Sequence, residues 1–237
     1  MILAQNPFCV FFFSYLDTGT FEPDEDCIMD VLYLARKYIL PELVDDCEKL
    51  AKQLVDAESV WNIITKALQN HEETICDACL TFIRLHTSEV FKTANEIQQI
   101  KQNALEFVLD NTMLNTKEET IFQFCLAWAK EQLTKQHKKH TAPNIRKVLG
   151  ACLFKIQFQN FTSETFTQWM DKTNLLDDKA KLQFYRCIGL GQNRKASDHP
   201  TRFELKQRAK ESAQQKFDIP EDEKLLKTIF RLVSYEN

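Results

Sequence analysis

Glycine is scarce in this sequence, with four residues among 237. Tight β-hairpins and phosphate-cradling loops need glycine because their backbones adopt positive φ angles. The scarcity therefore favours a helical chain and disfavours a nucleotide-binding enzyme. Eighteen phenylalanines need a core to pack in, and the length suits one large or two modest domains, so we expect a folded protein.

Apolar residues recur with a helical period from residue 24 onwards. The first stripe runs from Ile28 to Ile39, and Pro41 then ends that helix and suits the first turn of the next one. Short turns separate the helices that follow, apart from a non-helical run between Phe154 and Phe161. The pattern predicts an all-α protein built from antiparallel helix pairs. The later helices are expected around residues 43–54, 60–68, 75–83, 97–108, 121–129, 145–152, 163–170 and 178–188.

Several residues are expected to begin or end these helices. Asp56 precedes the third stripe and suits an N-cap. Thr116 and Glu119 have the spacing of a capping box, in which each side chain accepts a hydrogen bond from the other residue's backbone N–H. Gly189 and Gly191 lack the preceding strand and the third glycine of a phosphate-binding loop, so a helix C-cap is the better interpretation.

The charge pattern narrows the classes of partner, and the cysteine pattern indicates the compartment. The formal net charge is −4 and no basic field covers the chain, so neither nucleic acid nor a membrane surface is an expected partner. The eight cysteines are dispersed and mostly fall in apolar stripes, which is typical of reduced core thiols in an intracellular, cytoplasmic protein. No run approaches the ~20 apolar residues of a membrane span. Phe11–Gly19 also lacks the basic flank of a secretion signal.

Cys76 and Cys79 are the strongest candidates for metal ligands, with His71 and His86 nearby in the sequence. Structural zinc sites usually combine two such pairs, and this sequence has one. Both cysteines also fall on the apolar stripe of their helix. Core packing is therefore the preferred interpretation and no cofactor is expected, while a zinc module stays the alternative.

The remaining polar clusters give no catalytic signature. His137 and His140 lie in a lysine-rich loop whose simplest interpretation is a solvated surface. The carboxylate pairs at 45–46 and 118–119 are expected on solvated faces or near helix caps, where acidic residues are common. The basic segment 194–216 lacks the interleaved aromatics of a single-strand binder, although an RNA-binding alternative stays open. We therefore expect a protein without enzymatic activity.

Parts of the chain resemble a known family. YLDTG at 15–19 and IMDVLYLARKYILPELVDDCEKLAKQLV at 28–55 resemble the last part of a BTB/POZ domain. Residues 56–133 resemble the BACK domain that follows BTB domains, through AESVWNIITKAL, ICDACLTFI and LNTKEETIFQFCLAWA. The block at 145–166 is similar to the family branch with a C-terminal PHR β-sandwich, and Gln159 stands where that branch usually has proline.

The resemblance implies three parts in the chain. Residues 1–55 correspond to the C-terminal helices of a BTB/POZ fold, residues 56–190 to a BACK-like helical domain, and residues 191–237 to a polar, basic helical tail. The first half of the BTB domain and the PHR domain have no counterpart in the sequence. The apolar faces of Phe11–Leu16 and Ile28–Ile39 are therefore expected to be exposed.

The resemblance also implies a function. Relatives of this kind are substrate adaptors of cullin-3 RING ubiquitin ligases, so a non-catalytic interaction module with cullin-3 as partner is expected, impaired by the missing BTB half. The alternative is a helical scaffold that pairs with full-length BTB proteins, or with itself, without ligase activity. Ile63 lies off the apolar stripe of its helix and is expected at the surface. The implied partner-binding residues are Val60, Ile63, Ile64 and Leu68.

Overall fold

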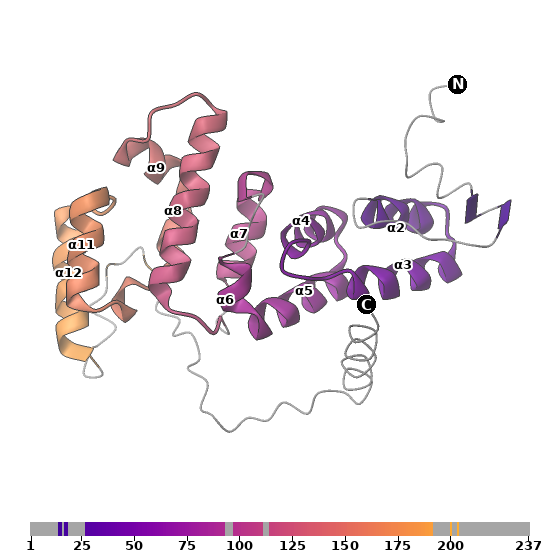
Figure 1. Ribbon diagram of the computed structural model, residues 1–237, viewed down its shortest axis with the longest axis horizontal. Coiled ribbons are helices and arrows are strands. Elements are labelled where there is room, and N and C mark those ends of the chain that lie inside the picture. Colours follow the sequence, from indigo (N-terminus) through magenta and orange to yellow (C-terminus); the bar gives the residue numbers. More distant parts are fainter. Residues whose placement is uncertain are drawn as a thin grey trace, which may run out of the picture.

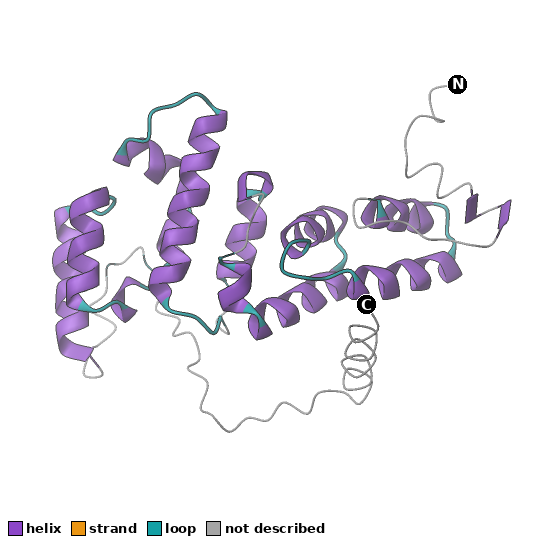
Figure 2. Cartoon of the chain, viewed as in Figure 1, coloured by secondary structure: helices purple, strands orange, loops and turns teal. Residues whose placement is uncertain are grey.

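The computed structural model describes residues 14–15, 17–18, 27–92, 97–110, 114–191, 200 and 203. The expectations for Phe11–Phe13, for Gly19 and for the basic tail lie outside these residues. Within the described ranges the chain forms helices, turns and loops and no strand, as Figure 2 shows. The predicted all-α class is confirmed.

The helices follow one another along an elongated row, from α2 and α3 at one end to α11 and α12 at the other (Figure 1). The first half of this row comprises α2 (Ile28–Lys37), α3 (Pro41–Gln53), α4 (Val60–Asn70), α5 (Glu73–Leu85), α6 (Thr87–Val90), η2 (Ile97–Gln99) and α7 (Gln102–Leu109). The second half comprises α8 (Glu118–Lys135), α9 (Ala142–Leu149), α10 (Cys152–Lys155), η3 (Phe158–Asn160), α11 (Ser163–Thr173) and α12 (Asp178–Leu190).

Consecutive helices pack in pairs. α2 lies on α3, α4 on α5, α8 on α9 and α11 on α12, while α3 also contacts α5. The apolar stripes of these helices meet in one cluster of buried side chains that extends from Ile28 to Phe184. A single core therefore links elements on both sides of the expected boundary at residue 56.

The expectation that the face of Ile28–Ile39 is exposed is wrong for most of that stripe. Ile28, Val31 and Leu32 are fully buried, because α2 lays this face on α3 and α4. Ile39 is the exception at 84% exposed, since α2 ends at Lys37 and the chain turns away there.

Of the expected helix starts, Pro41 is confirmed because it opens α3. Asp56 is not the N-cap of α4, which is Ser59, although its carboxylate accepts the backbone N–H of Ser59 at 2.7 Å in the turn before that helix. The capping box at Thr116 does not form, since Lys117 is the N-cap of α8 and no side chain caps it. Glu118 is buried instead of solvated, because its carboxylate accepts the backbone N–H of Gln157 at 2.9 Å.

The run from Phe154 to Phe161 also differs from the expected non-helical segment. It contains the end of α10 and the single turn η3. The turn η3 carries Phe158 into the core, where its side chain is fully buried. The Phe158 ring makes edge contacts with Phe122 and Phe184, at centroid distances of 5.4 Å each. These contacts join α8, η3 and α12.

Candidate functional site

The α4–α5 pair is fixed to α2 by polar contacts. The Arg36 guanidinium donates to both carboxylate oxygens of Glu72, from Nε at 2.6 Å and from Nη2 at 2.7 Å. Glu72 is 3% exposed, so this two-point contact lies at the edge of the core. Lys66 of α4 pairs with Asp30 of α2 at 3.4 Å. The pair is therefore held in a fixed position relative to the preceding helices.

The expected partner-binding residues lie mostly inside this arrangement. Val60, Ile63 and Ile64 are buried, with exposed fractions of 0%, 1% and 0%, and Leu68 is half-buried. The expectation that Ile63 faces outward is wrong, because α4 is covered on more than one side and a residue off the main stripe still meets the core. Binding of a partner by these four residues stays a prediction.

An aromatic cluster anchors the first turn of α4. The Trp61 ring stacks on Phe124 of α8 at a centroid distance of 5.4 Å and meets Phe91 edge-on at 5.8 Å. The ring is 4% exposed, and its indole Nε1 is a buried donor without a hydrogen-bond partner. Buried polar groups are nearly always paired, so this nitrogen is an exception that asks for an explanation.

Trp61 also lines a groove formed by two neighbouring pockets. The larger one, of about 630 Å³, lies between η2, the start of α7, the second half of α8 and α9. The smaller one, of about 240 Å³, lies between α4 and η2. Both are lined by Gln99, Ile100 and Lys101, so they adjoin one another. We refer to the two pockets together as the α4–α9 groove.

Cys76 and Cys79 lie on the buried face of α5. Burial raises the pKa of the Cys76 thiol to about 11 and that of Cys79 to about 12, each from 9.0. Thiols with such values stay protonated at neutral pH, whereas zinc binds thiolates. The core-packing interpretation therefore fits their environment. No group of three or more His, Cys, Asp or Glu side chains suited to a metal ion occurs in the described ranges.

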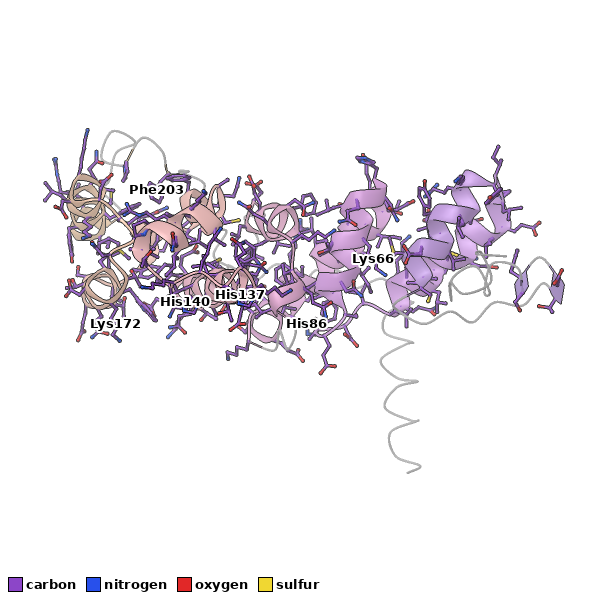
Figure 3. The ribbon with its side chains drawn as sticks, turned by 90° about the horizontal axis from the view of Figure 1, so that it is seen from above. Lys66, His86, His137, His140, Lys172 and Phe203 are labelled. Atoms are coloured by element: carbon purple, nitrogen blue, oxygen red, sulfur yellow. The ribbon has the colours of Figure 1, made fainter. Side chains whose placement is uncertain are left out.

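The described histidines lie at the surface. His137 and His140 are exposed in the loop after α8, and His140 Nε2 lies 3.0 Å from the hydroxyl of Thr134. His86 stacks on Phe82 at the end of α5, on a different part of the row of helices (Figure 3). These positions fit the solvated-surface interpretation.

No sequence pattern indicates the α4–α9 groove. Trp61 falls within the expected helix at 60–68, and Lys135 and Lys138 fall in the lysine-rich stretch around His137. Lys101 and Lys147 are separated in the sequence by two whole helices, α7 and α8. Only the packing of α7, α8 and α9 places these residues around one hollow. The sequence does show a concentration of lysine near residue 138. It does not show that these lysines surround a groove.

Comparisons with known proteins agree with the arrangement of helices. Residues 60–171 match the BACK family, "BTB And C-terminal Kelch". The chain is 24% identical over 163 residues to BTB/POZ domain-containing protein 6 of Homo sapiens, which covers 69% of this chain and 30% of that protein. It is 26% identical over 163 residues to BTB/POZ domain-containing protein 6-B of Danio rerio, covering 69% of this chain and 34% of that protein.

A second relative gives the same picture. The chain is 25% identical over 151 residues to BTB/POZ domain-containing protein 3 of Homo sapiens, covering 64% of this chain and 29% of that protein. The chain thus spans about a third of the length of the curated relatives it matches. In the part of the chain that the structure describes, no helix has the length and apolar character needed to cross a bilayer.

Proposed function

This chain is a protein of the BTB/BACK type, with its BACK domain at residues 60–171, and on that premise we propose that it is a non-catalytic adaptor for cullin-3 ubiquitin ligases. An adaptor performs no chemistry on its substrate. It holds the substrate beside the ligase and so raises the effective concentration of one for the other. The observation that carries the proposal is the BACK match over the helices from α4 to α11.

The α4–α5 pair is the proposed partner-binding element. Its position is fixed by the contact between Arg36 and Glu72, which favours binding because a rigid surface loses little freedom when a partner docks. Leu68 is half-buried and is the member of the predicted set able to touch a partner directly. Val60, Ile63 and Ile64 are proposed to hold α4 in place from inside.

A cytoplasmic location is part of this proposal. The seven described cysteines form no disulfide with one another, and all of them are buried. Free thiols are typical of compartments where glutathione and thioredoxin keep cysteine reduced, and cullin-3 adaptors work in such a compartment. We also propose that the chain divides at residue 56 and that its tail is helical. We further propose that the chain is related to the PHR-bearing branch of the family.

The alternative, a scaffold that pairs with full-length BTB proteins, has one observation in its favour. Tyr33, Tyr38 and Ile39 are large apolar side chains with exposed fractions of 51%, 58% and 84%. All three belong to α2 and the turn after it. Exposed apolar groups gathered on one element are typical of surfaces that bind another protein.

Co-precipitation distinguishes the two functions. The tagged chain is incubated separately with purified cullin-3 and with a purified full-length BTB relative. Retention of cullin-3 supports the adaptor, and retention of the relative alone supports the scaffold. Retention of neither contradicts both proposals.

Leu68 provides the sharper test of the proposed surface. Leu68→Ala is expected to weaken cullin-3 binding about 5- to 10-fold, because the loss of a leucine side chain packed at the centre of an interface costs about 1–1.4 kcal/mol. Leu182→Ala on α12 is the matched control, since Leu182 is 64% exposed and lies at the far end of the row. Equal affinities for the two variants would exclude Leu68 from the interface, and a thermal melt checks that both remain folded.

A further inference from the structure

The last helix of the row carries apolar side chains on its outer side. Leu182, Tyr185 and Leu190 of α12 are 64%, 37% and 42% exposed. Leu182, Tyr185 and Gly189 follow one another at intervals of three and four residues, so they lie along one side of the helix, and Leu190 lies beside them. We refer to these four residues as the outer α12 face. α11 and α12 end the row of helices in Figure 1. Large apolar side chains gathered on one exposed face are typical of a surface that binds another segment.

The outer α12 face is open and has a fixed shape. A Cβ atom at Gly189 would meet no other heavy atom within 4 Å, so a second helix can approach the backbone closely there. The Tyr185 hydroxyl donates to Thr167 Oγ1 at 2.9 Å, and the Tyr185 ring meets the Phe166 ring edge-on at a centroid distance of 5.0 Å. Both contacts hold the Tyr185 side chain against α11. A preformed surface of this kind loses little freedom when a segment docks on it.

The sequence contains an amphipathic segment that matches such a face. Pro220 and the acidic residues 221–223 are typical of the first turn of a helix. We refer to residues 220–233, which lie outside the described residues, as the C-terminal segment. A single helix of this length is marginal in water, so it gains stability by packing on an apolar surface. Its apolar residues recur with a helical period at Leu225, Leu226, Ile229, Phe230 and Val233.

Phe203 brings the chain that leads to this segment beside α12. The Phe203 ring meets Phe184 of α12 edge-on at a centroid distance of 4.9 Å and Phe154 of α10 at 5.2 Å. Residues 204–219 lead from Phe203 to the C-terminal segment, and a chain of that length without regular structure spans about 20 Å on average. α12 has 13 residues and is therefore about 20 Å long. The segment can thus reach the outer α12 face, and its tether gives it a high effective concentration there.

The charges along α12 favour an antiparallel orientation of the segment. Arg186 is exposed beside the apolar stripe, in the second half of the helix, and is in no ion pair with the described residues. Asp177 and Asp178 lie at the start of α12. An antiparallel segment brings its acidic residues 221–223 toward Arg186 and keeps them away from the two aspartates. Complementary charges of this kind fix the orientation of two docked surfaces.

We propose that the C-terminal segment folds as a helix and packs antiparallel on the outer α12 face of the same chain. Its apolar stripe covers Leu182, Tyr185 and Leu190, and its backbone passes closest at Gly189. The inference rests on the proposed helical character of the tail and goes beyond the adaptor proposal. Its tests contain no cullin-3, so the failure of one proposal is distinguishable from the failure of the other.

Disulfide trapping in the full chain tests the proposal. Every variant carries Cys9→Ser, and the seven other cysteines are buried. Under mild oxidation, Leu190→Cys combined with Leu226→Cys is expected to form an intramolecular disulfide at least about tenfold faster than Leu85→Cys combined with Leu226→Cys, because docking raises the effective concentration of the first pair. Leu85 is a matched control, since it is 58% exposed and lies on α5 in the middle of the row. Equal rates overturn the proposal. A disulfide that forms only between two chains also overturns it, because it assigns the face to a second copy.

Two further comparisons test the orientation. Leu190→Cys combined with Val233→Cys is expected to react about tenfold more slowly than the pair with Leu226→Cys, and a faster reaction contradicts the antiparallel arrangement. Arg186→Glu is expected to slow the Leu190→Cys, Leu226→Cys reaction about fivefold, because it replaces an attractive charge beside residues 221–223 with a repulsive one. Lys179→Glu makes the same change of net charge near the start of α12, and its rate is expected to stay within about twofold. Equal slowing by both charge reversals contradicts the contact with Arg186.

The reactivity of a thiol on α12 tests which side of the segment docks. In a Leu182→Cys variant, Ile229→Asn combined with Val233→Asn is expected to raise the rate of reaction with Ellman's reagent at least about fivefold, because the apolar stripe no longer covers α12. Lys227→Asn combined with Arg231→Asn alters the opposite side of the same helix, and its rate is expected to stay within about twofold. An unchanged rate in the first variant, or an equal rise in both, overturns the proposal.

Discussion

At the scale of single residues, this chain places ordinary side chains where most proteins use glycine. α2 ends in a Schellman motif, in which Leu40 N–H donates to the carbonyl of Ala35 and Ile39 N–H to that of Arg36. Ile39 adopts the left-handed conformation there, with φ of 57°. His71 and Asn174 occupy the same region after α4 and α11, with φ of 59° and 47°. Because glycine is scarce, residues with a Cβ adopt the left-handed conformation at these helix ends, and their backbone is strained there.

Ile39→Gly is expected to stabilise the protein by about 1 kcal/mol, because a β-branched residue pays roughly that much to adopt a left-handed conformation. Ile39 is 84% exposed, so little packing is lost. Urea denaturation measures the change. Ile39→Ala is the matched control, since alanine removes the same side chain and keeps most of the backbone strain. An equal gain in both variants contradicts the role of strain.

The buried thiols predict how stability depends on pH. Burial raises the pKa of Cys47, Cys79 and Cys152 to about 12 each. An unfolded cysteine has a pKa of about 8.5, so above that pH the unfolded state loses protons that the folded state keeps. The contribution to stability is complete below about pH 8.5 and is lost as the pH rises toward 12.

The free energy of unfolding is therefore expected to fall between pH 8.5 and pH 10.5, by up to about 1.4 kcal/mol per pH unit for each thiol. Denaturation curves across this range measure the slope. Cys47→Ala is expected to have a shallower slope, because one of the shifted thiols is removed. A stability that stays constant or rises over this range would refute the prediction.

At the scale of elements, side-chain caps and one partly buried ion pair position the helices. The carboxylate of Asp177 accepts the backbone N–H of Ala180 at 2.7 Å and begins α12. The hydroxyl of Thr162 accepts the N–H of Thr165 at 3.2 Å and begins α11. These two helices close the far end of the row in Figure 1.

Asp177→Ala is expected to cost about 1 kcal/mol of stability, because the first turn of α12 loses its acceptor. Thermal or urea denaturation checks the loss. Asp178→Ala is the neighbouring control, since that side chain is fully exposed and makes only a 3.5 Å pair with Lys181, and a change within about 0.5 kcal/mol is expected. A larger loss for Asp178→Ala would show that the cap is not the stabilising feature.

Glu72→Gln is expected to destabilise the protein by about 1–2 kcal/mol, because the amide turns a donor toward Arg36 and the two-point contact is lost, while solvent around the half-exposed Arg36 screens part of the pairing. Glu73→Gln is the control at the next position, where the side chain is exposed and carries no ion pair. Equal stability of the two variants would mean that Arg36 and Glu72 do not join α2 to α5.

The elements were predictable from the sequence where a local signal decides the outcome. The periodic stripes and Pro41 gave the order of the helices and the start of α3, because they depend on neighbouring residues alone. The capping box at Thr116 failed because the Glu118 carboxylate finds a tertiary partner in Gln157 N–H. The prediction that Ile63 lies at the surface is wrong for a related reason. Burial on a second side of α4 depends on helices that are distant in the sequence.

At the scale of the whole molecule, one core joins α2 and α3 to the helices that match the BACK family. Side chains from α2 to α12 form a single buried cluster, and ion pairs join α2 to both α4 and α5. The candidate sites differ in how far the sequence reveals them. Family resemblance pointed to α4, whereas the lysines of the α4–α9 groove meet only through the packing of three helices.

Cullin-3 binding by the whole chain decides between the proposed functions. Isothermal titration of the purified chain with purified cullin-3 measures this binding. We expect a saturable heat with a Kd in the range of about 1–10 μM, weakened by Leu68→Ala and unaffected by Leu182→Ala. The absence of any binding heat at concentrations up to about 100 μM, with both proteins folded, would contradict it.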